Sequence, residues 1–352
     1  MTAAALRDAY RRAGHWTDET FAGFIDRRVD ADPGMRVRIW SDVAPRTTTA
    51  GEIRERSRRI ATGLRRRGIG VGDIVAYQMP SWAETIEVLW AGFAIGATMV
   101  PIIHFYGPAE VAFILNQSGA RALVTVGGFG NLDHLANLEA IRGDLEVETI
   151  VVADTIARTR ILPGAVALSE VADEEPLSEP SAVDPDRPAM IGYTSGTTAE
   201  PKGVIHSHRS LLAEVRQLTS LNVAGGRPTL MASPIAHMTG MLGGSLVPLH
   251  NGDAIELIDR WDPARVLSIV AAEDLSPGGG ATIFLTSLLD HPDFGPQHLA
   301  RMARFGLGGA PVPAAVAQRA EAMGIRVMRA YGSTEHPSIT GSPMTDPADK
   351  RT

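Results

Sequence analysis

A run of small hydroxyl-bearing residues precedes one of the two lysines of the chain. It follows an apolar segment that ends at Tyr193, and it consists of Thr194, Ser195, Gly196, Thr197 and Thr198, with Lys202 shortly after. Backbone N–H groups and hydroxyls in such a loop can surround phosphate oxygens, and glycine lets the backbone approach closely. Lys202 would add a mobile positive charge for a polyphosphate tail. The run therefore predicts a triphosphate-binding loop in preference to an ordinary surface loop.

Other nucleotide and catalytic motifs fit less well. The spacing from Gly196 to Lys202 differs from that of a Walker A motif, and Gly203 stands where that motif has Ser or Thr, so a P-loop NTPase is the weaker alternative. Ser195 lacks the Gly-x-Ser-x-Gly setting of a hydrolase nucleophile. His206 and His208 stand close together in a predicted loop, which favours a structural or substrate-proximal role over zinc binding.

The elements that must position this loop alternate between helices and strands. Helices are predicted around 53–64, 108–117 and 132–141, and another begins at a capping box formed by Ser81 and Glu84. Strands are predicted at 74–79, 97–102, 122–126 and 149–153. Apolar strands that alternate with helices predict an α/β fold of layered, parallel-rich sheets flanked by helices.

A proline-rich, acidic connection at about 163–188 is expected to join two lobes. The predicted first lobe covers 1–180 and ends in this connection, and the second covers 181–352. Strands of the second lobe are predicted at 189–193, 229–233, 254–258, 281–285 and 325–330. An arginine-rich run at 54–67 is typical of a solvated helix face rather than an anion-binding surface.

The composition excludes several classes of function. The chain has no cysteine, which removes disulfides and thiol nucleophiles and fits a reducing cytoplasm. A net charge of -7 gives no field that would favour nucleic acid. Residues 88–105 carry no acid, Lys or Arg, but Gly92, Gly96 and Pro101 interrupt them, so a buried helix leading into a buried strand is expected, not a transmembrane segment. We expect a cytoplasmic protein without a nucleic-acid partner. Whether it forms a homo-oligomer is left open.

The full loop resembles the signature of the superfamily of acyl-CoA synthetases, nonribosomal peptide adenylation domains and firefly luciferase. That signature reads Tyr-Thr-Ser-Gly-Thr-Thr-Gly-x-Pro-Lys-Gly. This chain matches it from Tyr193 to Gly203, except that Ala199 stands at the second of its three Gly positions. Two further motifs of the family stand at Tyr331, Gly332, Ser333, Thr334 and Glu335, and at Gly308, Gly309, Ala310 and Pro311. The resemblance runs from about Thr17 to Met344 and implies the large N-terminal domain of an adenylate-forming enzyme, truncated before its end.

The resemblance implies a role for each motif. Tyr331 would stack on adenine, Thr334 would contact the α-phosphate region, and Glu335 would help to hold Mg²⁺, with Thr194 as a second metal contact. The backbone of residues 308–311 would lie against adenine, and residues 194–198, Lys202 and residues 331–334 complete the nucleotide-binding set. Catalytic roles are implied for Lys202, Thr334, Glu335 and His237.

The stretch 234–240 resembles the family segment that lines the carboxylate pocket. The implied acid-binding residues are His237, Met238, Gly240 and Met241, together with Gly308. Amino-acid-activating relatives have an Asp just after the position of His237, where this chain has Met238. We therefore expect an aliphatic, alicyclic or aromatic acid as substrate, not an amino acid.

The implied activity is that of an AMP-forming acid–thiol ligase, with ATP, Mg²⁺ and CoA. A carboxylic acid would become an acyl-adenylate with release of pyrophosphate, and the CoA thiol would displace AMP. In the family a ribose-binding Asp, a hinge and a mobile C-terminal domain with a catalytic lysine follow, and Lys350 lacks that context. We therefore expect an incomplete portion that binds ATP weakly and adenylates poorly by itself. The alternatives are a non-catalytic nucleotide- or acyl-binding module and acyl transfer to a carrier protein instead of CoA.

Overall fold

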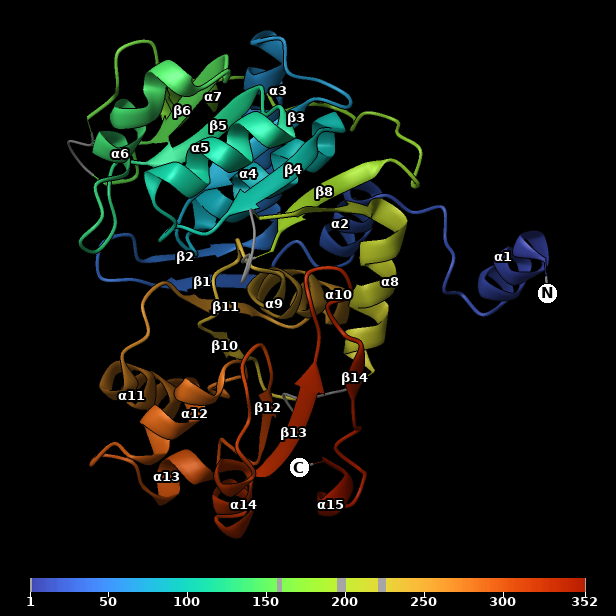
Figure 1. Ribbon diagram of the computed structural model, residues 1–352, viewed down its shortest axis with the longest axis vertical. Helices are drawn as coiled ribbons and strands as arrows, with labels where there is room; N and C mark the ends of the chain where they lie inside the picture. The colour runs from blue at the N-terminus through green and yellow to red at the C-terminus, as the bar shows by residue number, and fades with distance from the viewer. Residues whose placement is uncertain (1, 157–159, 195–200, 221–225, 352) are drawn as a thin grey trace. The chain divides into compact units, whose positions relative to one another are not determined.

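The computed structural model describes residues 2–156, 160–194, 201–220 and 226–351 (Figure 1). The chain divides into two compact units, of which the first holds Met1–Met35 and Thr48–Ala213. The second unit holds Arg36–Thr47 and Glu214–Thr352. This division differs from the expected boundary near residue 180, because the strands that follow the acidic connection join the sheet of the first unit.

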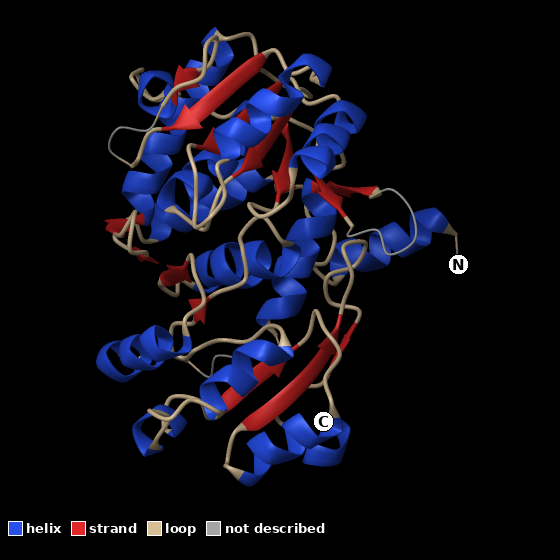
Figure 2. Cartoon of the chain, turned by 60° about the vertical axis from the view of Figure 1, so that its left-hand side comes forward, coloured by secondary structure: helices blue, strands red, loops and turns tan. Residues whose placement is uncertain are grey.

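The first unit is built on a seven-stranded sheet with the order β7-β6-β5-β3-β4-β8-β9. Its strands are β3 (Ile74–Gln78), β4 (Thr98–Ile102), β5 (Ala122–Val126), β6 (Thr149–Ala153), β7 (Val166–Ala167), β8 (Pro188–Tyr193) and β9 (Gly203–Ser207). All pairings are parallel except that of β9 with β8. Every residue of β4 and β5 is buried, as expected for strands covered on both faces, and helices surround the strands in Figure 2. The expected α/β class is confirmed.

The helices of the first unit follow the predicted order with one correction. They are α1 (Ala3–Arg12), α2 (Phe21–Ala31), α3 (Ala50–Arg66), α4 (Ala83–Ile95), α5 (Pro108–Ser118), α6 (His134–Ile141), the 3₁₀ turn η1 (Arg142–Asp144) and α7 (Leu168–Val171). Helix α8 (His208–Thr219) begins in the first unit and ends in the second. Helix α4 begins one residue later than predicted, because its N-cap is Trp82, whose side chain caps no backbone N–H, and not Ser81. A capping box stands instead at the start of α3, between Thr49 and Glu52.

The arginine-rich face of α3 is not simply solvated. Arg58 donates to the carbonyl of Leu177 over 3.0 Å and forms an ion pair of 2.6 Å with Asp26. Arg59 donates to the carbonyl of Glu174 over 2.8 Å. The expected face is thus corrected, since part of it binds the acidic connection of its own chain.

The second unit contains two smaller sheets. The four-stranded sheet has the order β10-β11-β1-β2 and consists of β10 (Leu230–Met231), β11 (Ile255–Ile258), β1 (Arg36–Trp40) and β2 (Arg46–Thr49). The three-stranded sheet has the order β12-β13-β14 and consists of β12 (Arg304–Leu307), β13 (Arg326–Tyr331) and β14 (Thr340–Gly341). The helical elements are α9 (Met238–Met241), the π-helix η2 (Leu242–Leu246), α10 (Val247–Asn251), α11 (Pro263–Glu273), α12 (Thr282–Leu289), α13 (Pro296–Leu299), α14 (Ala314–Ala322) and α15 (Ala348–Arg351).

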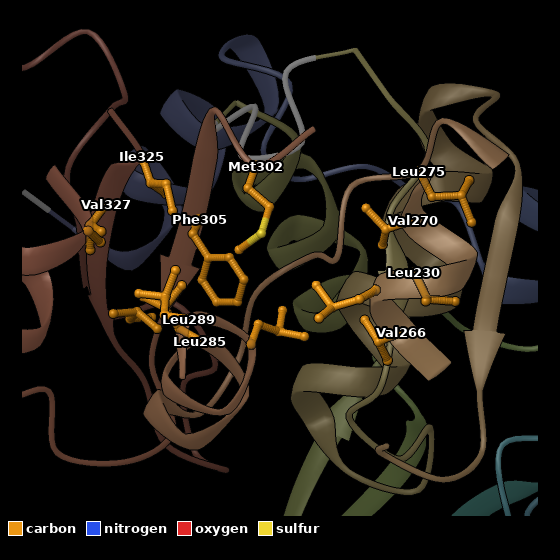
Figure 3. Packing of buried hydrophobic residues seen from close by; sticks show 14 of the residues in the cluster. Leu230, Val266, Val270, Leu275, Leu285, Leu289, Met302, Phe305, Ile325 and Val327 are labelled. Carbon is orange, nitrogen blue, oxygen red and sulfur yellow. The ribbon is translucent and has the colours of Figure 1, made fainter. Parts of the chain in front are cut away.

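The strand predicted at 281–285 is wrong, because these residues belong to helix α12. The β-branched residues of this run favour a strand locally, but Leu285, Leu288 and Leu289 are buried at helical spacing while Ile283 is 62% exposed. Figure 3 shows Leu285 and Leu289 close to Phe305 of β12 in the hydrophobic core of this unit. Burial on one helical face therefore overrides the local preference for a strand.

Candidate functional site

The predicted phosphate loop connects the two strands of a hairpin. Tyr193 at the end of β8 pairs with Gly203 at the start of β9. The N–H of Thr194 donates to the carbonyl of Lys202 over 3.1 Å, and the N–H of Lys202 donates to the Thr194 hydroxyl over 3.3 Å. The loop is followed by β9 and then by α8, which begins at His208.

These bonds close the base of the loop and leave the Lys202 side chain exposed. A β-carbon at Gly203 would lie 2.9 Å from a methyl of Ile191, so only glycine fits the hairpin at this point. The predicted residues Ser195, Gly196, Thr197 and Thr198 lie outside the described residues. What the structure describes is therefore the base of the loop, with Thr194 on one side and Lys202 on the other.

Two other predicted motifs follow adjacent parallel strands in the second unit, so they lie at the same edge of its sheet. Strands β12 and β13 are parallel, with Leu307 opposite Arg329. Gly308 follows β12, and Gly332 follows β13 after Tyr331. The carboxyl ends of adjacent parallel strands are where open α/β sheets bind their ligands. The structure thus brings together two motifs that are separate in the sequence.

A glycine-rich segment brings the predicted acid-binding stretch to this same edge. Ser276 pairs in parallel with Thr229 beside β10, and Gly280 pairs in parallel with Leu307 of β12. The N–H of Gly308 donates to the carbonyl of Gly280 over 3.0 Å. A β-carbon on Gly280 would lie 3.3 Å from the hydroxyl of Ser233, which follows β10. The segment 276–280 therefore lies between β10 and β12, and the loops that follow β10, β12 and β13 share one edge.

The loop after β12 lies against the backbone of the neighbouring strand. A β-carbon on Gly308 would lie 3.0 Å from the carbonyl oxygen of Ala330, and Gly309 has a φ of 74° that suits glycine. Ala310 and Pro311 are exposed, and the Thr282 hydroxyl donates to the carbonyl of Pro311 over 2.9 Å. A flat group could therefore approach the backbone of this loop.

The loop after β13 presents an exposed ring and an exposed carboxylate. Tyr331 is 62% exposed and pairs with Thr340 of β14, so residues 332–339 connect an antiparallel hairpin. The carbonyl of Pro337 occupies the space that a β-carbon on Gly332 would need, which requires glycine there. Thr334 is half-buried and Glu335 is exposed. Together with Ser333 they form a tight turn near the carboxyl end of β13.

Helix α8 holds this loop through residues that no sequence motif indicated. Glu214 pairs with Nδ1 of His336 over 2.8 Å and accepts a hydrogen bond from the Ser338 hydroxyl. Gln217 donates from its amide to the carbonyl of Ser338 over 2.9 Å. The two partners of Glu214 are more than a hundred positions later in the chain, and a lone Glu on an amphipathic helix gives no signal of such a contact.

His237 is the N-cap of α9, where its Nδ1 accepts the N–H of Thr239 over 3.2 Å. His237 is exposed as a residue, yet desolvation by the surrounding protein lowers its pKa. The ring is therefore neutral at pH 7, and because Nδ1 accepts a hydrogen bond, the proton is on Nε2.

The neighbours of His237 are buried. Met238 and Met241 are 8% and 1% exposed, and the carbonyls of Ser233 and Pro234 leave no room for a side chain at Gly240. The predicted acid-binding stretch thus combines one neutral hydrogen-bond donor with apolar side chains.

The described residues contain no cluster of metal ligands, and His208 has a structural role. Among the described residues no three His, Cys, Asp or Glu side chains gather in a way that could hold a metal ion. His208 is 1% exposed, and its Nδ1 accepts the N–H of Phe21 over 3.2 Å, which is a structural role.

A family model described as AMP-binding enzyme matches residues 25–352. The chain belongs to this family of AMP-binding enzymes. A medium-chain fatty-acid–CoA ligase of Escherichia coli is 29% identical over 94% of this chain and 58% of its own length. A feruloyl-CoA synthase of Amycolatopsis is 30% identical over 82% of this chain and 54% of its own length. The chain thus spans somewhat more than half the length of these curated relatives.

Solved structures of AMP-binding enzymes share the fold. The anthranilate CoA ligase AuaEII in complex with anthranoyl-AMP has a TM-score of 0.82 at 21% identity, over 94% of this chain and 63% of its own. The N-terminal domain of FACL13 from Mycobacterium tuberculosis has a TM-score of 0.77 at 24% identity, over 90% of this chain and 76% of its own. These likenesses confirm the predicted fold of the large N-terminal domain of adenylate-forming enzymes.

Most of the apolar stretch 88–105 is buried, as predicted. Residues 88–95 belong to α4 and residues 98–102 form β4, and all of them are buried, whereas Phe105 at its end is 57% exposed. In the described part of the chain, no helix combines the length and the apolar character needed to cross a bilayer.

Proposed function

We propose that the whole protein uses ATP to activate a carboxylic acid and transfers the acyl group to CoA. The observation that carries the proposal is the arrangement of three loops at one edge of the second unit, after β10, β12 and β13. Family membership supports it, and so do relatives named as CoA ligases for fatty and aromatic acids.

In this proposal the loops after β12 and β13 bind the nucleotide. Adenine would lie between the exposed ring of Tyr331 and the backbone of residues 308–311, because an aromatic face stacks on a base and glycines permit close approach. The Thr334 hydroxyl would contact the α-phosphate. Residues 194–198 and Lys202 would bind the other phosphates.

Mg²⁺ would neutralise phosphate charge when bound, and Glu335 and Thr194 are the residues we propose to hold it. Glu335 suits this role because its carboxylate is exposed. The hydroxyl of Thr194 already accepts one hydrogen bond, from the N–H of Lys202, and still has a lone pair for a metal ion.

The proposed acid pocket lies near His237, Met238 and Met241, with Gly240 and Gly308 as its small residues. The neutral ring of His237 can donate one hydrogen bond from Nε2 to the carboxylate, and the methionines provide apolar surface for the acyl chain. An ammonium group has no acidic partner in this stretch, since Met238 follows His237. A fatty, alicyclic or aromatic acid is therefore the proposed substrate class.

The proposed reaction has two balanced steps. A carboxylate oxygen attacks the α-phosphorus of ATP, the bond to the bridging oxygen breaks, and pyrophosphate leaves. The CoA sulfur then attacks the acyl carbon, AMP leaves with the carboxylate oxygen, and the thiol proton is released. The protein aligns the reactants and neutralises the phosphates, and Lys202, Thr334, Glu335 and His237 are the side chains proposed for this.

Nucleotide binding provides the first test. We expect AMP to bind to the purified protein in a calorimetric titration, and Tyr331→Ala to weaken binding about tenfold or more, because stacking on a base is worth about 1–3 kcal/mol. Tyr10→Ala is the matched control, since Tyr10 is an exposed tyrosine of α1. Failure of AMP to bind, or equal effects of the two substitutions, would overturn the proposal.

Turnover provides the second test. The whole protein is incubated with ATP, Mg²⁺, CoA and a panel of carboxylic acids, and AMP and thioesters are detected by mass spectrometry. We expect AMP and an acyl-CoA with fatty, alicyclic or aromatic acids and none with amino acids. If AMP forms only when a carrier protein replaces CoA, the proposed acceptor is wrong while the proposed adenylation stands.

A further inference from the structure

The loop 332–339 carries the two residues proposed to contact phosphate and metal, and its ends alone do not determine its shape. It connects β13 to β14, and β14 contains only two residues. Within the loop, the N–H of Ser333 donates to the carbonyl of His336 over 3.0 Å. This bond brackets Thr334 and Glu335, so the position of His336 constrains the backbone that carries them.

Helix α8 supplies anchors for the second half of this loop. Glu214 has an 11% exposed side chain, and its two oxygens have different partners: Oε1 pairs with Nδ1 of His336, and Oε2 accepts from the Ser338 hydroxyl. Gln217 lies three positions later on the same face of α8 and donates to the carbonyl of Ser338 over 2.9 Å. Three polar contacts thus join the loop to one helix face.

We infer that Glu214 is a positioning residue, which holds the loop 332–339 in the shape that the nucleotide phosphates and their metal ion require. The inference rests on the proposed function. Ordering a free loop on binding costs conformational entropy, and a loop that is already ordered avoids this cost. Glu214 itself does not touch the proposed ligand, and it acts through His336 and Ser338.

This role predicts an effect on phosphate recognition that a general loss of packing would not give. Tyr331 belongs to β13 and is held by its pairing with Thr340, so adenine stacking does not depend on Glu214. Thr334 lies inside the turn that His336 closes. Removal of Glu214 should therefore weaken binding of AMP far more than binding of adenosine.

The test compares dissociation constants for AMP and adenosine by calorimetry in wild type, Glu214→Ala, Glu214→Gln and Glu273→Ala. We expect Glu214→Ala to weaken AMP binding about tenfold, the usual scale for hydrogen bonds to a charged group, and to change adenosine binding less than about twofold. Glu214→Gln keeps an acceptor for the Ser338 hydroxyl and should recover part of the loss. Glu273→Ala, which removes a partly exposed partner of Arg38 in the same unit, should leave both constants unchanged.

The outcomes separate this inference from the proposed function. If wild type binds no AMP, the proposed function fails and the inference fails with it. If wild type binds AMP and Glu214→Ala binds it equally well, the inference is wrong while the proposed function stands. An equal loss for adenosine and AMP would also overturn it, because the role would then be structural.

A milder variant covers the case in which Glu214→Ala does not fold. Ser338→Ala removes one of the two contacts of Glu214 and leaves the carboxylate paired with His336. We expect it to raise the ratio of the AMP to the adenosine dissociation constant in the same direction. An unchanged ratio in folded Ser338→Ala would contradict the inference.

Discussion

Individual histidines take different roles because their surroundings differ. His237 caps α9 and is exposed, whereas His208 is buried and packs against the stacked rings of Phe21 and Phe93. From the sequence, His208 is predicted to have either a structural or a substrate-proximal role. The hydrogen bond from the N–H of Phe21 to its Nδ1 explains its place, since it satisfies a backbone donor at the start of α2.

Burial of His208 predicts a pH-dependent stability. Desolvation lowers its pKa from 6.5 to about 4, so the unfolded chain binds a proton between these values that the folded chain does not. The free energy of unfolding should therefore fall as the pH drops from 6.5 towards 4, by up to about 1.4 kcal/mol per pH unit from this residue. Above pH 6.5 the residue contributes no slope.

The measurement is the denaturant-induced unfolding of wild type and His208→Asn at several pH values. Asn keeps an oxygen that can accept the N–H of Phe21 but cannot take up the proton. The variant should show a smaller slope between pH 4.5 and 6, on the order of one proton less, and the same slope as wild type between pH 7 and 8. Equal slopes in the acidic range would contradict the assigned burial.

Single elements show where tertiary packing overrides local preference. The run Thr282–Leu289 is rich in residues that favour strands, and only the presence of a core on one side makes a helix the better solution. The glycine-rich segment before it takes the strand-like position instead, beside β12. This exchange matters for the site, because that segment brings the loop after β10 to the edge shared by β12 and β13.

Two substitutions in α12 distinguish the helix from the predicted strand. A strand would place Ile283 and Leu285 on the same face, whereas the helix buries Leu285 fully and leaves Ile283 62% exposed. Leu285→Ala should therefore lower the free energy of unfolding by about 2–5 kcal/mol, and Ile283→Ala by about 0.5 kcal/mol or less. Urea unfolding followed by circular dichroism measures both. Similar losses for the two variants would favour the strand.

At the scale of the whole molecule, the second unit is assembled from distant parts of the chain. β1 pairs in parallel with β11, so β1 and β2, which lie near the N-terminus, share a sheet with β10 and β11, which come from residues 230–258. Glu256 of β11 is fully buried at its side chain and joins the two strands, because it accepts from Arg36 and from the indole N–H of Trp40, each over 2.8 Å.

Removal of this carboxylate should weaken the second unit. Glu256→Ala leaves the indole N–H of Trp40 and the guanidinium of Arg36 without this acceptor. We expect the free energy of unfolding to fall by about 1.5–3 kcal/mol, the usual range for hydrogen bonds to a charged group. Glu273→Ala is the matched control, since its pair with Arg38 is partly exposed and should be worth less than about 1 kcal/mol. Denaturant-induced unfolding followed by tryptophan fluorescence measures both losses. A loss no larger than that of the control would contradict the role of Glu256.

The sequence by itself determined the fold class, most strands of the first sheet and the family, because periodicity and motif spacing depend on neighbouring residues. The residues after β12 and β13 that are proposed to bind a nucleotide are also predictions from the sequence, since glycines, an aromatic ring and a carboxylate act through their own chemistry. Only the tertiary structure decided that residues 281–285 form a helix, that the arginines of α3 bind the acidic connection, and that Glu214 anchors the loop 332–339. Each of these depends on a contact between segments far apart in the chain, which no local pattern records.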